Sequence, residues 1–218
     1  MDKEIYEQII SKKDFSQLPK RDVEMAFNHF KNRQVNLEEK IRLTRALLHK
    51  VFASFTSKKL LSLKDKEPEW VLRKHLSTRE RLPYYSEVYE KLLGDFKFEG
   101  EKLTVFDLGA GINGFGFEYF PDKKNLYYVG IEAMGQLADL MNYYFKTRGL
   151  NALAVHESLF SLDKIKKYLV QGNEKKIVFL FKTLDSLEMM KPDYSKKLLK
   201  EIIPLVDRVV VSFATQSM

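Results

Sequence analysis

The residues of this sequence best suited to chemistry lie in one short segment and at one position beyond it. Asp107, Gly109 and Gly111 lie at or just after the end of the apolar run 103–109, and Glu132 ends the next apolar run, 126–132. Glycines at such a turn let the backbone approach a ligand closely, because no Cβ lies in the way. A carboxylate at the end of the neighbouring strand can accept both hydrogen bonds from a ribose diol. The pattern predicts a site for a cofactor that contains a nucleoside without a ribose phosphate.

Two cofactor classes fit this description, a nicotinamide dinucleotide and S-adenosylmethionine. The acidic residue before the glycines favours the second. The arrangement Asp107-x-Gly109-x-Gly111 resembles the opening of the cofactor loop in class I methyltransferases, in which the aspartate helps to hold the methionine end of S-adenosylmethionine. A tight turn in some other α/β domain is the alternative interpretation.

The elements that must position these residues form a regular alternation after residue 100. Apolar runs, rich in β-branched and aromatic residues, lie at 103–109, 126–132, 152–158, 176–182 and 207–214, and helix-like segments lie at 134–147, 162–169 and 194–203. Continuous apolar strands that alternate with helices predict a parallel sheet covered on both faces, an α/β fold of Rossmann-like type. Ligands bind such sheets at the carboxyl ends of the strands.

The first hundred residues have no strand pattern. Residues 22–30 and 36–48 have helical periodicity, and Asn36 is suited to cap the second helix, with Glu38 and Glu39 in its first turn. We expect an all-helical N-terminal subdomain over residues 1–74, followed by the sheet domain over residues 75–218.

The basic residues are concentrated in the N-terminal half. Lys and Arg number 37 and Asp and Glu 30, which gives a net charge of +7 and a pI near 9.3, and such a balance favours an anionic partner. Between residues 40 and 64 there is no acidic residue, and this basic stretch is our candidate RNA-binding surface: Lys40, Arg42, Arg45, Lys50, Lys58, Lys59 and Lys64. A solvated face of the helical subdomain is the alternative.

Composition excludes several classes of protein. There is no cysteine, which rules out disulfides and thiolate zinc sites, and we expect no metal. No stretch approaches the roughly 18 apolar residues of a membrane span. We expect a soluble, cytoplasmic monomer.

The segment His75-Leu-Ser-Thr-Arg-Glu-Arg-Leu-Pro83 decides the family resemblance. On its own it could be an amphipathic helix capped by Ser77 or Thr78. It also closely resembles the H-x-S-T-x-E-R-L motif of the aminoglycoside-resistance 16S rRNA methyltransferases, which methylate ring nitrogen 7 of a guanine in the decoding site. Three further segments are similar to that family over residues 40–218. They are 107–113, with Gly114 in place of a proline; Lys182 followed by Glu188; and 208–217, with Ala214 and Gln216 in place of a proline and an arginine.

The resemblance implies S-adenosylmethionine as cofactor and 16S rRNA of the small ribosomal subunit as substrate. The cofactor-binding residues that it implies are His75, Ser77, Thr78, Arg81, Asp107, Gly109, Gly111, Asn113, Glu132, Glu157 and Ser158. Glu157 and Ser158 are expected at the adenine edge. Lys182 is expected to orient the base or a phosphate, and Glu188 to stabilise the positive charge of the methylated ring. Tyr84, Tyr85 and Phe213 are candidates to stack on a guanine turned out of the RNA.

Two alternatives remain open at this point. One is a methyltransferase of the same fold that acts on another RNA or a small molecule, and the other is a non-catalytic RNA-binding or ribosome-assembly factor. The length of 218 residues accommodates about five strands, whereas class I methyltransferases usually have about seven, so we expect a sheet whose last two strands are missing.

Overall fold

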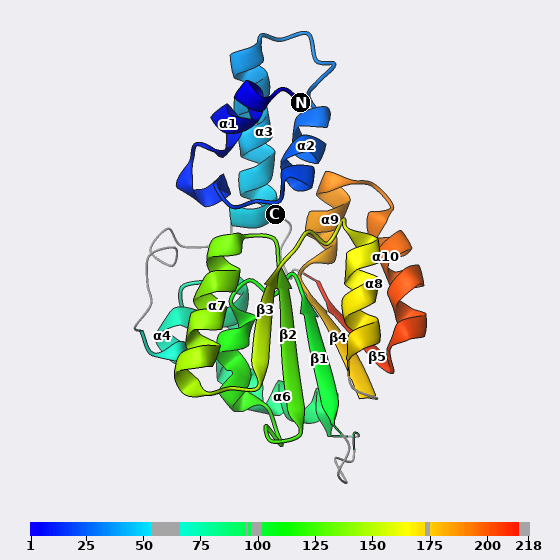
Figure 1. Ribbon diagram of the computed structural model, residues 1–218. Coiled ribbons are helices and arrows are strands. Elements are labelled where there is room, and N and C mark those ends of the chain that lie inside the picture. The colour runs from blue at the N-terminus through cyan, green and yellow to red at the C-terminus, as the bar shows by residue number, and fades with distance from the viewer. Residues whose placement is uncertain (54–65, 95, 97–101, 173–174, 214–218) are drawn as a thin grey trace.

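The C-terminal half of the molecule is built on a five-stranded parallel sheet (Figure 1). The computed structural model describes residues 1–53, 66–94, 96, 102–172 and 175–213. The strand order is β3-β2-β1-β4-β5, which confirms the predicted α/β fold. The strands are β1 (Leu103–Leu108), β2 (Leu126–Glu132), β3 (Ala152–His156), β4 (Lys175–Phe181) and β5 (Arg208–Ser212). The five predicted strands are therefore confirmed within a few residues.

Helices cover both faces of the sheet, as continuous apolar strands require. On one face, Tyr89 stacks on Phe120 at 3.9 Å and on Phe179 of β4 at 6.0 Å between ring centroids. On the other face, Phe106 of β1 lies against Gly172, at the end of α8. The helices of this half are α6 (Tyr85–Leu93), η5 (Asn113–Tyr119), α7 (Gly135–Arg148), α8 (Leu162–Gln171), α9 (Leu184–Met190), α10 (Tyr194–Ile202) and η6 (Ile203–Leu205).

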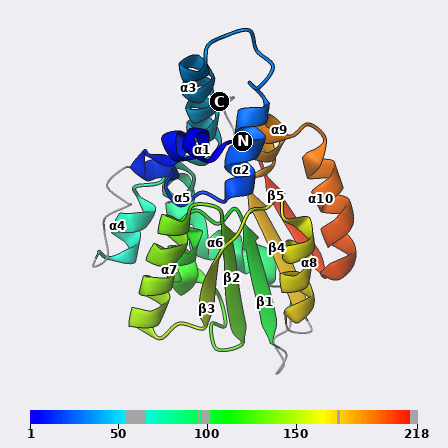
Figure 2. The ribbon, with the colours of Figure 1, turned by 45° about the horizontal axis from the view of Figure 1, so that its top comes forward.

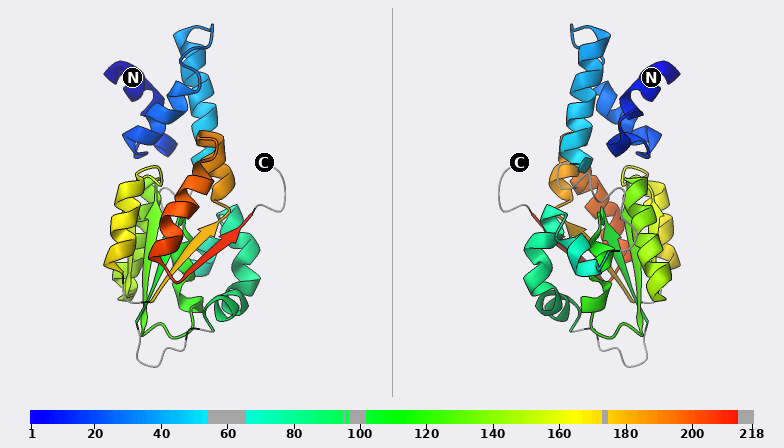
Figure 3. Two further views of the ribbon diagram at one scale, coloured as in Figure 1. Left: turned by 90° about the vertical axis from the view of Figure 1, so that its right-hand side faces the viewer. Right: turned by 90° about the vertical axis from the view of Figure 1, so that its left-hand side faces the viewer.

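The N-terminal region is helical and lies over the carboxyl ends of the strands (Figures 1 and 2). It comprises α1 (Lys3–Ile10), η1 (Lys13–Phe15), α2 (Lys20–Asn28), α3 (Leu37–Leu48) and the π-helical turn η2 (His49–Ala53). Asn36 caps α3 as predicted, because its Oδ1 accepts a 2.9 Å hydrogen bond from the Glu39 N–H. In Figure 3 the arrowheads of β4 and β5 point towards this region.

The segment between the two halves forms short helices instead of one long amphipathic helix. They are α4 (Pro68–Leu72), α5 (Leu76–Arg81) and η4 (Leu82–Tyr84), and α6 follows directly. Ser77 and Thr78 do not cap this helix, contrary to the alternative interpretation: both lie inside α5, and Thr78 Oγ1 donates to the Leu72 carbonyl at 2.6 Å. Pro83 interrupts the helical run because it has no N–H to donate.

None of the described helices is both long enough and apolar enough to span a bilayer. Nor do the described His, Asp and Glu side chains form a group of three or more that could hold a metal ion.

Candidate active site

A cavity opens at the carboxyl ends of β1, β2 and β4, beneath the helical region. Its empty volume, including the opening to solvent, is about 860 Å³. Most of the predicted cofactor residues line it: His75, Ser77, Thr78, Arg81, Asp107, Gly109, Gly111, Asn113 and Glu132. Lys182 also lines it. The sheet therefore brings together residues from α5, from the loop after β1 and from the ends of β2 and β4.

The glycine loop after β1 takes a path that only glycine follows without strain. Gly109 and Gly111 have φ values of 77° and 56°. A Cβ on Gly109 would lie 2.8 Å from Thr183 Cγ2, and one on Gly111 would lie 3.2 Å from His75 Nε2. The loop is thus pressed between the end of β4 and the start of α5, and its backbone forms the floor of the cavity.

Asn113 connects the loop to α5, the helix within the family motif at 75–83, and to α6. Its Nδ2 donates to Asp107 Oδ2 at 2.6 Å, and its Oδ1 accepts from Arg81 at 3.1 Å and from the Tyr85 hydroxyl at 2.7 Å. Tyr128 donates to the same Asp107 oxygen at 2.8 Å. Burial raises the pKa of Asp107, and these two donors and the Arg81 charge act against that rise. Asp107 thus supports the loop indirectly, through its hydrogen bond with Asn113.

Arg81 presents a guanidinium to the cavity. Its Nη1 donates to Ser77 Oγ at 2.8 Å, and the group lies 4.7 Å from the ring centre of Phe181. Its Nε is buried and has no hydrogen-bond partner among the described residues. The hydrogen bonds to Ser77 and Asn113 hold the guanidinium in place, and it keeps N–H groups that those bonds do not use. Such a group is suited to bind a carboxylate.

Glu132 lies at the end of β2 with its carboxylate in the cavity wall. Oε2 accepts from the Gly111 N–H at 2.7 Å and Oε1 from the Met134 N–H at 2.8 Å. Burial raises the pKa of Glu132, and the two backbone N–H groups act against that rise. Each oxygen keeps a further lone pair, so the carboxylate is oriented and can still accept hydrogen bonds from a diol.

His75 closes the cavity above the glycine loop in a neutral form. Burial, with the nearby charges of Arg81 and Lys182, lowers the pKa of His75 to about 4. At neutral pH its imidazole therefore carries no charge next to the two cations.

These residues lie in the segment that matches a known family. Residues 33–218 match the family described as ribosomal RNA methyltransferase (FmrO). The chain belongs to this ribosomal RNA methyltransferase family. A curated relative is the 16S rRNA (guanine(1405)-N(7))-methyltransferase of Micromonospora echinospora, 27% identical over 146 residues. The match covers 66% of this chain and 48% of the relative, so the chain spans about half the length of the curated relative that it matches.

Solved structures share the fold. The 16S rRNA methyltransferase RmtF, in complex with S-adenosyl-L-homocysteine, superposes with a TM-score of 0.80 at 21% identity, over 100% of this chain and 84% of that one. The 16S rRNA methylase RmtB gives 0.73 at 17% identity, over 97% and 83%. The likeness extends through the helical region as well as the sheet.

The family's methyl donor is compatible with the residues that line the cavity. The glycine loop leaves backbone surface that a Cβ would fill, Glu132 offers oriented acceptor oxygens, and Arg81 offers an unused donor. Gly114, one departure from the family motif, has a packing explanation: a Cβ there would lie 2.6 Å from Phe145 Cζ. The other two departures, Ala214 and Gln216, lie outside the described residues.

Three predicted site residues lie outside the cavity wall. Glu157 is not among the lining residues, and its Oε2 lies 2.7 Å from Lys164 Nζ. Ser158 is fully buried and donates its hydroxyl hydrogen to Asp22. Glu188 accepts from the N–H groups of Asp193 and Ser195, both at 2.7 Å, and so caps the first turn of α10. The adenine role of Glu157 and the catalytic role of Glu188 stay predictions without a supporting contact.

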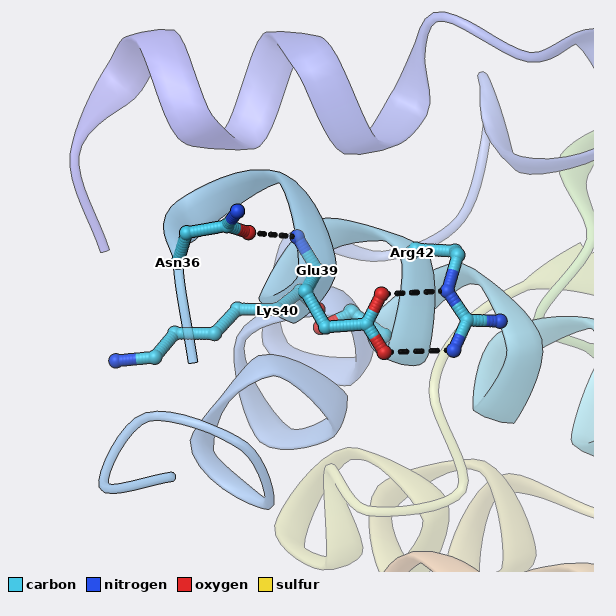
Figure 4. Close-up of polar contacts among 5 residues, drawn as sticks. Asn36, Glu39, Lys40 and Arg42 are labelled. Atoms are coloured by element: carbon cyan, nitrogen blue, oxygen red, sulfur yellow. Dashed lines mark hydrogen bonds and ion pairs between the residues drawn. The ribbon is translucent and has the colours of Figure 1, made fainter. Parts of the chain in front are cut away.

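The described part of the basic stretch is largely engaged within the protein. Arg42 pairs with Glu39, one turn earlier, at 2.7 and 2.6 Å (Figure 4). Lys40 donates to the Lys31 carbonyl at 2.8 Å. Arg45 donates to Ser11 Oγ at 2.9 Å and to carbonyls at the end of α1, and Lys50 is exposed. Lys58, Lys59 and Lys64 lie outside the described residues. The RNA-binding role of all seven stays a prediction.

Sequence reasoning missed the part of the wall that comes from the helical region. Asp22 of α2 and Val51 and Phe52 of η2 line the cavity, as does Phe160 in the loop after β3. In the sequence, Asp22 is one more acid in the first turn of a helix, and nothing distinguishes it from a solvated one. Only the fold shows that α2 lies over the strand ends.

Proposed function

We propose that this protein transfers a methyl group from S-adenosylmethionine to the 16S rRNA of the small ribosomal subunit. The observation that carries the proposal is one cavity that holds Glu132 and Arg81 beside a glycine loop. There Glu132 can accept hydrogen bonds from a diol, and Arg81 can donate hydrogen bonds to a carboxylate. Membership of a ribosomal RNA methyltransferase family supports it. We further infer that the protein acts in the cytoplasm as a monomer, with residues 1–74 as its RNA-facing part.

Different residues of the cavity bind different parts of the cofactor. Glu132 accepts hydrogen bonds from the ribose, and Arg81 pairs with the carboxylate of the methionine end. Asp107 and Asn113 hold Arg81 in place, and Ser77 and Thr78 fix the turn of α5 that carries it. The cofactor supplies a methyl group on a positively charged sulfur. Neutral His75 adds no further positive charge next to that sulfur.

The favoured target atom is ring nitrogen 7 of a guanine, the atom named for the curated relative. This nitrogen carries a lone pair and no proton at neutral pH, so the protein need not supply a base. β4 is followed by Lys182-Thr183-Leu184, whereas enzymes that methylate exocyclic amines commonly have an Asn/Asp-Pro-Pro-aromatic turn there. Orienting the base for in-line approach is then the main task of the chain.

Lys182 is placed to take part in that orientation. It follows β4 directly, has a left-handed backbone with φ of 56°, and its Nζ pairs with Glu80 of α5. Such strained conformations persist where the surrounding structure holds them, and they are common at functional sites. We infer that Lys182 contacts the target base or a phosphate next to it.

Two aromatic side chains can receive a base that has been turned out of the RNA. Tyr84 is 58% exposed and Phe213 is 62% exposed, so both present a free ring surface. The third candidate, Tyr85, was wrong, because its ring is buried and its hydroxyl is bound to Asn113. Stacking on such a ring offsets part of the cost of unstacking the base.

The experiment is a methylation assay on assembled small subunits with radiolabelled S-adenosylmethionine. Mass mapping of the modified RNA then identifies the nucleotide and the atom. We expect incorporation into 16S rRNA and none into free nucleosides. Glu132→Gln should abolish most of it, and Glu118→Gln, at an exposed pair with Lys123 outside the cavity, is the matched control. Cofactor binding without methylation of any RNA would instead support a non-catalytic binding factor.

A further inference from the structure

Asp22 is a buried carboxylate with one oxygen satisfied and one oxygen free. It lies in the first turn of α2 and is 1% exposed. Oδ1 accepts the hydroxyl hydrogen of Ser158, 136 residues away in the chain. Oδ2 is buried and has no hydrogen-bond partner among the described residues. Asp22 lines the cavity, so its free oxygen lies at the edge of the space that a ligand would fill.

A buried acceptor without a donor costs stability. The burial of Asp22 raises its pKa to about 7, and the nearby carboxylates of Glu157 and Glu132 raise it further, against the Ser158 hydrogen bond and the Arg21 charge. The folded protein therefore holds an acidic group in an unfavourable position. A ligand that donates a hydrogen bond to Oδ2 would offset this cost.

The place of Asp22 relative to the other cavity residues indicates which part of a ligand it meets. Asn113, which Arg81 of α5 contacts, lies in the loop after β1, Glu132 at the end of the neighbouring β2, and Ser158 after β3, the next strand. Asp22 therefore lies beyond Glu132 and opposite Arg81. Here the wall is largely apolar, formed by Leu159 and Phe160 of the loop after β3. An apolar slot with one acceptor oxygen fits a flat ring that bears an amino group.

We propose that Asp22 Oδ2 accepts a hydrogen bond from the exocyclic amino group of the adenine of the methyl donor, and so selects adenine over a 6-oxo purine. The inference rests on the proposed function for the presence of an adenine nucleoside. It makes the helical region part of the cofactor site, through a residue that precedes the family match at 33–218. It also assigns to Asp22 the contact that the sequence suggested for Glu157, which is instead tied to Lys164.

The selectivity has a simple physical basis. A carboxylate only accepts hydrogen bonds, so the oxygen of a 6-oxo purine would face Oδ2 with no hydrogen between them. A site built around a hydrogen bond rejects an analogue that cannot make it. An asparagine at position 22 keeps the contact with Ser158 through its oxygen and presents an NH₂ group where Oδ2 was. That variant would donate to a 6-oxo purine and oppose adenine.

The test is calorimetric titration at pH 8 with S-adenosylhomocysteine and its 6-oxo analogue. The wild type should bind the adenine compound about 10- to 100-fold more tightly, as expected for a hydrogen bond to a charged group. Asp22→Asn should weaken binding of the adenine compound about 10-fold or more and remove or reverse the preference. Asp163→Asn, at an exposed acid in the first turn of α8, is the matched control and should bind like the wild type.

The outcomes separate this inference from the proposed function. If Asp22→Asn keeps the wild-type affinity and preference, or if the wild type binds both compounds equally, the role of Asp22 is refuted and the methyltransferase proposal stands. If the wild type binds neither compound, both proposals fall. Thermal unfolding of each variant without ligand shows that the fold is intact before titration.

Discussion

Replacing Asp22 by asparagine should stabilise the protein in the absence of ligand, in a manner that depends on pH. The side chain is buried, and Oδ2 has no partner among the described residues. Asparagine has nearly the same shape and keeps the contact with Ser158, but it carries no charge to desolvate. The variant therefore isolates the cost of the buried carboxylate.

The magnitude follows from the pKa of Asp22, which rises from 3.8 to about 7 on folding. A difference of that size corresponds to about 4 kcal/mol, at about 1.4 kcal/mol per pKa unit. The NH₂ group of the asparagine is buried without a partner, which costs about 1 kcal/mol or more. We therefore expect the free energy of unfolding to rise by about 1–3 kcal/mol at pH 8. Because the folded state binds the proton more tightly, the stability of the wild type falls as pH rises from about 4 to about 7 and then levels off. The difference between the two proteins should therefore be small at pH 4.5 and reach its full size above pH 7.

Urea unfolding at pH 4.5, 6, 7 and 8, followed by tryptophan fluorescence, measures this difference. Glu132, Glu157 and Arg21 face the same carboxylate and are present in both proteins, so their own titration largely cancels in the comparison. A difference that does not change with pH would refute the reasoning. So would a variant that is less stable than the wild type at pH 8.

Three further predictions test the rest of the site. Glu132→Gln should weaken binding of S-adenosylhomocysteine about 10- to 100-fold in calorimetry, because an amide NH₂ cannot accept from the Gly111 N–H; unchanged affinity would exclude Glu132 as the ribose acceptor. Asn113→Ala should lower the free energy of unfolding by about 2–4 kcal/mol in urea, since it leaves several buried partners, Asp107 among them, without a hydrogen bond; a loss below about 1 kcal/mol would contradict its linking role. The His75 ring should show no titration by NMR between pH 5.5 and 8, because burial holds its pKa at about 4, and a midpoint near 6.5 would show that the ring is solvated.

Local physical chemistry explains why so much of the fold was predictable. Strands buried on both faces must be apolar throughout, so runs such as 126–132 and 176–182 stand out in the sequence. Glycines with positive φ are required where the loop after β1 turns, which marks Gly109 and Gly111. Asn36 caps its helix through a partner three residues away, a contact that spacing alone defines.

The sequence was least informative where a contact spans a long stretch of chain or where a side chain has several possible partners. Glu157 follows β3 directly, and its carboxylate pairs with Lys164 on the following helix, at 2.7 Å. Glu188 has the expected position in the chain, yet it faces the start of α10. Tyr85 sits in an amphipathic pattern that does not reveal that its hydroxyl is bound to Asn113.

The sequence by itself determined the parallel sheet, the glycine loop, the carboxylate at the end of β2 and the family, because each depends on residue types at short and regular spacing. Only the tertiary structure decided that α2 covers the strand ends and that Asp22 faces the cavity. Its partner Ser158 lies 136 residues away, and no local pattern encodes a pairing of that length. A buried acid and a solvated acid are the same letter in a sequence, and it is packing against distant segments that gives them different chemistry.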